Sequence, residues 1–111
     1  MTETVDSLLK NTLDSLGVPC ERLFYSRQAD TFLTFQLVTG QETGFADDDT
    51  QSTLYTYMIH LFSRHDYISL IRQLKQSLKA AGFFNVLIGA EMYEKDTGYY
   101  HIPITVNYLE E

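Results

Sequence analysis

The sequence has few of the residues on which small proteins with disulfides, metal sites or membrane spans depend. Its 111 residues include one cysteine, two prolines and no tryptophan. A single cysteine, Cys20, cannot form a disulfide within the chain, so we expect a fold that does not depend on an oxidising compartment. No apolar run approaches the roughly 20 residues that cross a bilayer. The acidic start MTETVDSLL is unlike the basic beginning of a signal peptide.

Basic residues are also scarce. Lys and Arg number 8 against 15 Asp and Glu, which gives a formal net charge of −7. DNA and anionic membranes repel such a chain, so the charge argues against both as tightly bound partners. It leaves open a surface along which DNA slides without adhering. The hydrophobic fraction of 44%, with 8 Tyr and 7 Phe, argues against disorder and is enough for a hydrophobic core. We therefore expect one intracellular domain over residues 1–111.

Hydrophobic periodicity predicts two amphipathic helices. The first covers residues 4–16, and Gly17 suits the left-handed position after its end. The second covers residues 67–81, with Asp66 as its N-terminal cap and Gly82 at its end. Each helix has a single apolar stripe, so each must pack against another element.

Alternating or aromatic-rich segments predict five strands, and the order of elements is α-β-β-β-α-β-β. The strands cover residues 23–26, 31–38, 53–63, 83–94 and 99–108. Pro103 removes a ladder donor from the last strand, which predicts an edge strand or a bulge. The sequence therefore indicates an α+β fold in which two helices pack on one face of a mostly antiparallel or mixed sheet.

This arrangement leaves the other face of the sheet without a cover from the same chain. Tyr55 or Leu54, Tyr99 and Thr105 are expected on that face. An exposed surface of apolar and aromatic side chains often marks self-association. We therefore expect the uncovered face to pack against another molecule.

Motifs for catalysis or metal binding are missing. His60 lies in a predicted central strand and is interpreted as a satisfied core or interface histidine. His65 and Asp66 resemble an orienting pair and, with His101, would form the site of a small acid–base enzyme, although helix capping explains Asp66. Cys20 precedes an acidic residue, which disfavours a thiolate. No zinc or calcium pattern is present, so we expect no catalytic site, metal or cofactor.

The segment 39–52 carries the densest group of acids and looks least structured. Asp47, Asp48 and Asp49 are consecutive, and Phe45 is a lone aromatic residue before them. Long loops within compact domains are often functional. A solvated loop and an interface loop are both open for this segment.

The polar face of the second helix carries the one basic stripe of the sequence. Arg72, Lys75 and Lys79 share this face. A solvent-exposed helix face is the simplest interpretation, and a contact for an acidic partner is the alternative. The acidic residues cluster in the 42–49 region and at the termini, whereas an inhibitor that mimics DNA needs them spread over one face.

Four segments follow one another in a distinctive order and spacing. They are VPC-x-x-LFYSRQADTFLTFQLV at 18–38, LFSRHDY at 61–67, LIRQLKQSLKAAGF at 70–83 and MYEKDTGYYHIPITVNYLEE at 92–111. In this order they resemble the tail-terminator, or tail-completion, proteins of long-tailed phages and of prophages in Gram-positive bacteria. The resemblance spans nearly the entire chain, and the order of elements is that of the family fold.

The resemblance implies a structural protein and not an enzyme. Such proteins form a homo-oligomeric ring, usually a hexamer, on the head-proximal end of the tail tube. The ring ends polymerisation of the tube protein, joins the tail to the head–tail connector and lets DNA pass without specific binding. The implied location is the virion tail, and the host cytoplasm during assembly. Another head–tail connector or tail-assembly component is the alternative within the same setting.

The resemblance also implies that the 40–52 region reaches toward a neighbouring subunit or the tube. The interface candidates are Phe45, Asp47, Asp48, Asp49, Tyr55 and Tyr57.

Replacing Asp47, Asp48 and Asp49 by Asn tests this interpretation. The charges lie in a predicted loop, where they contribute little to stability. We expect light scattering to show changed assembly, or a changed dependence of assembly on salt, while the thermal unfolding midpoint stays that of the wild type. Loss of folding in the variant would make this segment part of the core instead.

Overall fold

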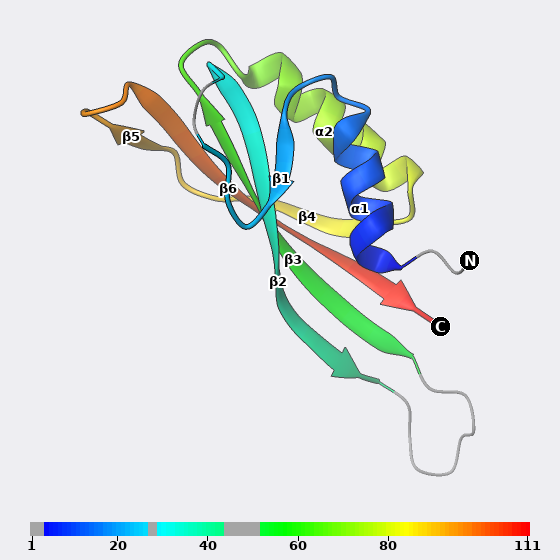
Figure 1. Cartoon of the computed structure of the whole chain (residues 1–111). Helices are drawn as coiled ribbons and strands as arrows, with labels where there is room; N and C mark the ends of the chain where they lie inside the picture. Colours follow the sequence, from blue (N-terminus) through cyan, green and yellow to red (C-terminus); the bar gives the residue numbers. More distant parts are fainter. Residues whose placement is uncertain (1–3, 27–28, 44–51) are drawn as a thin grey trace.

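A computed structural model describes residues 4–26, 29–43 and 52–111, with two helices and six strands (Figure 1). The elements are α1 (Val5–Asp14), β1 (Cys20–Arg22), β2 (Thr31–Glu42), β3 (Thr53–Ser63), α2 (Ile68–Ala80), β4 (Phe84–Ile88), β5 (Met92–Glu94) and β6 (Tyr99–Glu110). The predicted α+β fold class is confirmed. The order α-β-β-β-α-β-β-β differs from the prediction by one strand, because the segment predicted as a single strand at 83–94 is divided into β4 and β5.

The strands form one mixed sheet in the order β1-β2-β3-β6-β4, and β5 pairs with β6. β1 runs parallel to β2, and the other pairs are antiparallel. The first strand covers Cys20–Arg22 and not residues 23–26 as predicted. Leu23 has a φ of 69°, a left-handed conformation that the chain adopts as it leaves β1.

The expectation that Pro103 marks an edge strand or a bulge is wrong. β6 lies between β3 on one side and β4 and β5 on the other, and its pairing with β3 runs without a shift. The Pro103 carbonyl accepts a hydrogen bond of 2.7 Å from the Gly89 N–H, in the gap between β4 and β5. The backbone polar atoms of one strand residue point to the same side. The missing N–H of Pro103 therefore faces this gap and removes no bond to β3.

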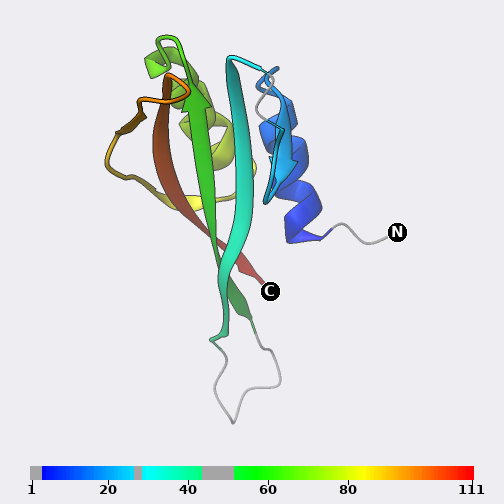
Figure 2. The ribbon, with the colours of Figure 1, turned by 60° about the vertical axis from the view of Figure 1, so that its left-hand side comes forward.

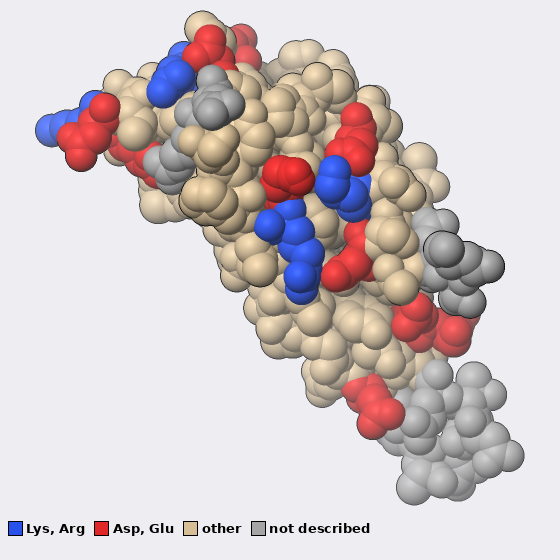
Figure 3. All heavy atoms as spheres, viewed as in Figure 1, with Lys and Arg blue, Asp and Glu red and all other residues tan. Residues whose placement is uncertain are grey.

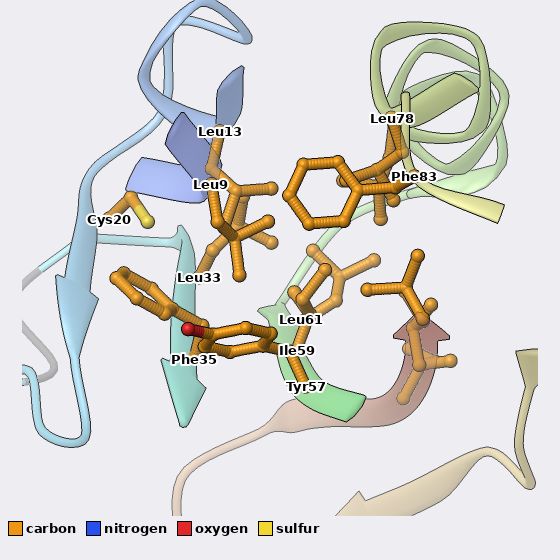
Figure 4. Packing of buried hydrophobic residues seen from close by; sticks show 14 of the residues in the cluster. Leu9, Leu13, Cys20, Leu33, Phe35, Tyr57, Ile59, Leu61, Leu78 and Phe83 are labelled. Atoms are coloured by element: carbon orange, nitrogen blue, oxygen red, sulfur yellow. The ribbon is translucent and has the colours of Figure 1, made fainter. Parts of the chain in front are cut away.

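Both helices pack on the same face of the sheet (Figures 1 and 2). The apolar stripes meet the inward-facing residues of β2, β3 and β6, as the alternation along these strands predicted. Figure 4 shows this packing, which includes Leu9, Leu13, Leu33, Phe35, Tyr57, Ile59, Leu61, Leu78 and Phe83. Burial of one such side chain stabilises the fold by roughly 1.5–3 kcal/mol.

The ends of the helices follow the sequence closely. Thr4 and Ser7 form a capping box at α1, in which the Ser7 N–H donates to the Thr4 hydroxyl over 3.1 Å. Gly17 and Gly82 follow α1 and α2 with φ of 81° and 101°, the left-handed conformation expected of them. The N-cap residue of α2 is Tyr67 and not Asp66 as predicted. The Asp66 carboxylate nevertheless accepts a bond of 3.0 Å from the Ile68 N–H at the start of the helix.

The face away from the helices is partly covered by the segment between β1 and β2. The Tyr25 ring lies 4.7 Å from the ring of Phe32, and the Tyr99 hydroxyl donates to the Ala29 carbonyl over 2.6 Å. Phe32, Phe62 and Tyr99 are buried beneath this segment. The expectation that Tyr99 lies on an uncovered surface is therefore wrong, although Tyr99 does point to that side of the sheet.

β2, β3 and β6 continue together beyond the helices as a three-stranded projection, which we call the arm (Figures 1 and 2). It consists of the paired residues 39–42, 53–56 and 107–110. The arm makes the molecule elongated, with extents of 54 × 29 × 24 Å. The strands therefore occupy part of the segment 39–52 that the sequence predicted as a loop.

Leu78→Ala tests the importance of the helix-to-sheet core. Leu78 is fully buried, so its truncation should lower the free energy of unfolding by about 2–5 kcal/mol. Leu87→Ala is the matched control, since Leu87 is 65% exposed and its loss should change stability by about 0.5 kcal/mol at most. Urea denaturation followed by circular dichroism measures both. Equal losses in the two variants would contradict the described packing.

Candidate functional site

The uncovered part of the sheet is the surface best placed to contact another molecule. We call it the open face and define it by Gln36, Met58, His60, Phe84, Leu87, Met92, His101 and Thr105. The pairing places them side by side: Gln36, Met58, Thr105 and Leu87 form one row across four strands. Met92 lies opposite His101, and Phe84 lies opposite Asn107.

The outer strands make the open face apolar. Leu87 is 65% exposed, Met92 47% and Phe84 45%. Contiguous apolar surface on a soluble protein commonly marks a binding region. The structure thus supports the expectation of an uncovered face, and it adds β4 and β5 as the elements that supply most of the exposed apolar side chains.

The sequence did not single out these residues of β4 and β5. The run FFNVLI at 83–88 is apolar at nearly every position, so alternation alone did not show which side chains point outward. Asn85 has a φ of 58°, and the pairing of β4 with β6 shifts between Phe84 and Leu87. This irregularity changes the face to which the following residues point, which a regular strand pattern cannot predict.

Two histidines meet near the middle of the open face. The His60 Nδ1 and His101 Nε2 atoms are 2.8 Å apart, and the His101 ring stacks on Phe62 at 4.2 Å. His60 is half-buried, and this desolvation holds the pKa of its imidazole below the ordinary value. One ring nitrogen must donate and the other accept, so the bond requires at least one neutral ring. The interpretation of His60 as a satisfied histidine agrees with this geometry.

The residues of the alternative acid–base site are held by different partners. His65 Nε2 lies 3.1 Å from an Asp30 oxygen, the Asp66 carboxylate bonds to the start of α2, and His101 contacts His60. The hydrogen bond of His65, and after it that of Arg64, holds the pKa of the exposed Asp30 carboxyl below its ordinary value. These contacts assign structural roles to the histidines and to Asp66.

Two of the predicted interface candidates, Tyr55 and Tyr57, point toward the helix side of the sheet. The Tyr57 hydroxyl donates to the Asp6 carboxylate of α1, and its side chain is buried. Burial, followed by the Asp6 contact, raises the pKa of Tyr57 above its ordinary value. Tyr55 lies in the arm, where its hydroxyl donates to Glu110 over 3.4 Å. A role of either tyrosine in an interface stays a prediction.

The remaining candidates, Phe45, Asp47, Asp48 and Asp49, lie outside the described residues. The nearest described acid in the sequence is Glu42, which is exposed at the end of β2. Thr53 pairs with Glu42 on one side and with Glu110 on the other. The described end of the arm is therefore acidic, which agrees with the sequence around it.

The described residues give little support to a metal site, a reactive cysteine or a membrane-spanning helix. Within residues 4–26, 29–43 and 52–111, no group of three or more His, Cys, Asp or Glu side chains is placed to hold a metal ion. Burial raises the pKa of the Cys20 thiol to about 12, so it stays protonated at neutral pH. Neither described helix is long and apolar enough to cross a membrane.

Comparison with known proteins identifies the fold. No protein-family model and no curated protein matches the sequence. Among solved structures, the chain is similar to a chain in the virion of a native gene transfer agent particle, with a TM-score of 0.57 and 8% sequence identity. The match covers 96% of this chain and 94% of the other. At this identity the similarity shows a shared fold along almost the full length of both chains.

Replacing His60 by Gln tests its environment through pH. The lowered pKa means that the unfolded chain takes up a proton as the pH falls below about 6.5, before the folded chain does. The folded state therefore loses stability over this range. We expect His60→Gln to lose less stability than the wild type between about pH 7 and pH 5.5, measured by urea denaturation. The same pH dependence in both proteins would contradict the described burial.

Proposed function

We propose that the protein is a structural component of a phage-type virion and acts as a tail terminator. Residues 1–111 form one terminator-like domain that assembles with copies of itself on the head-proximal end of the tail tube. The observation that carries this proposal is the fold match along almost the whole length of both chains to a chain of a virion particle. Fold alone does not establish function, and the resemblance of the four sequence segments adds the terminator role.

Two features of the surface support assembly. A ring requires each subunit to present two different surfaces that contact neighbours on either side. The open face and the arm are two such surfaces: the first is a face of the sheet, and the second is the end of β2, β3 and β6. The open face contributes apolar contact area, whereas the arm extends beyond the body formed by the helices and strands.

The charge of the chain supports the proposed position in the path of DNA. A net charge of −7 repels the phosphate backbone, so DNA passes through the ring without adhering to it. The ring number, usually six in the resembled family, is part of the proposal. The protein acts in the virion tail and is assembled in the host cytoplasm.

Another head–tail connector would share the fold and the setting, and the two roles differ in what the protein does to the tube. A terminator binds the tube end and stops its growth. A connector of the head binds without limiting tube length. The contacts of His65, Asp66 and His101 favour neither role, and they argue against the acid–base enzyme because each residue is engaged elsewhere.

Tube assembly with and without this protein tests the proposal. Tail tube protein from the same phage or prophage is polymerised alone or with an excess of this protein and imaged by negative-stain electron microscopy. We expect rings at one end of the tubes and tubes of limited length. Light scattering of the protein alone reports whether rings form before contact with the tube.

A tube that grows to the same lengths in the presence of this protein would overturn the terminator role. Rings bound to tube ends without any effect on length would favour the connector. A monomer in isolation is compatible with the proposal, because the tube end can itself template the ring.

A further inference from the structure

The outer face of α2 carries basic side chains that form no ion pair with the described part of the chain. Arg72, Lys75 and Lys79 are exposed and, with Gln76, line a surface hollow of about 230 Å³. We call these three cations the basic face. Among the described residues, no ion pair involves any of them. Three other cations, Lys10, Arg22 and Arg64, are each paired with an aspartate of the same chain.

An unpaired basic face is notable in a chain with a net charge of −7. Two copies of such a chain repel one another at long range unless patches of opposite sign face each other. The spacing of the three cations over two turns of one helix gives a continuous stripe and not a scatter of charges. The stripe can therefore attract an acidic partner.

The described acidic counterpart lies at the end of the arm. Glu42 and Glu110 flank Thr53 on neighbouring strands, and Glu111 follows at the end of β6. All three are exposed. Figure 3 shows acidic side chains gathered at this end of the molecule. We call these three glutamates the arm tip.

No ion pair among the described residues joins the basic face to the arm tip of the same chain. α2 packs on the body of the sheet, and the arm projects beyond the helices in both ribbon views (Figures 1 and 2). The Tyr55–Glu110 bond and the pairing along β3 hold the arm tip in this extended position. Both patches are therefore available to a second molecule.

We propose that the basic face of α2 binds the arm tip of a second copy of this chain. This inference rests on the proposed function, and it names the surfaces through which neighbouring subunits of the ring meet. The contact joins two different patches, so it repeats head to tail from subunit to subunit and closes when the rotation permits. Exposed ion pairs are individually weak, so this contact mainly determines which surface of the neighbour is bound and in which orientation. Apolar contact elsewhere adds affinity.

A charge reversal with a matched control tests the contact. Lys75→Glu reverses a cation of the basic face, and Lys95→Glu reverses an exposed lysine near the β5–β6 turn that is likewise outside the described ion pairs. Both variants change the net charge by the same amount. Ring formation, alone and on tube ends, is followed by light scattering and electron microscopy at low salt.

We expect Lys75→Glu to raise the concentration needed for ring formation by about threefold and Lys95→Glu, its match in charge, to leave it unchanged. Adding Lys79→Glu to Lys75→Glu should raise this concentration to about tenfold that of the wild type. A second set of variants checks the pairing directly. Glu42→Lys with Glu111→Lys should impair assembly alone and restore it when combined with Lys75→Glu and Lys79→Glu, because the signs are exchanged. Circular dichroism confirms that each variant is folded.

The outcomes separate this inference from the proposed function. Wild-type-like rings from the Lys75 and Lys79 variant would overturn the inference and leave the terminator role standing. Normal rings that no longer bind tube ends would also overturn it, because the basic face would then bind the tube protein. Failure of the wild type to limit tube growth would overturn the proposed function itself.

Discussion

The structure depends on the burial of two narrow apolar stripes against one face of three long strands. Leu9 and Leu13 of α1 and Leu74 and Leu78 of α2 lie against β2, β3 and β6, and this cluster contains most of the buried side chains of the described residues. A helix rises less than half as far per residue as a strand. Two helices of 10 and 13 residues therefore cover only part of the length of strands with 11 and 12 residues. The projecting arm follows from this mismatch, and the uncovered face follows from the packing of both helices on the other face of the sheet.

The same constraint explains how the surface is divided. On the face away from the helices, the segment that carries Tyr25 covers one end of the sheet and buries Phe32, Phe62 and Tyr99 there. Arg64 lies 4.2 Å from the centre of the Tyr99 ring and bonds to Asp30, so a charged pair closes this end. The rest of the face keeps its apolar side chains exposed on β4 and β5. A second molecule is the natural cover for that part.

Sequence patterns predicted the elements whose side chains alternate strictly or recur at helical spacing. The inward set of β6, from Tyr100 to Tyr108, and both glycine helix ends were predicted because each follows a local rule. The prediction of an edge strand or a bulge at Pro103 was wrong. Pro103 lies opposite the gap between β4 and β5, and the residues around Pro103 do not reveal that two separate strands pair with β6. Burial of Tyr99 depends on Ala29, 70 residues away, and no local pattern contains that contact. The apolar residues of the open face were missed for another reason, since the run at 83–88 is apolar at nearly every position and its pairing is irregular between Phe84 and Leu87.

The charge of the chain takes on a different meaning once the fold is known. A net value of −7 describes repulsion between whole molecules, yet contact is decided by where unpaired charges lie. Three aspartates of the body pair with Lys10, Arg22 and Arg64 of the same chain, whereas the glutamates of the arm tip and the cations of α2 have no described partner of opposite charge. Since no described ion pair joins these two sets within the chain, both are available for the directional association that we propose. An acidic protein can thus repel DNA and still select its own neighbour.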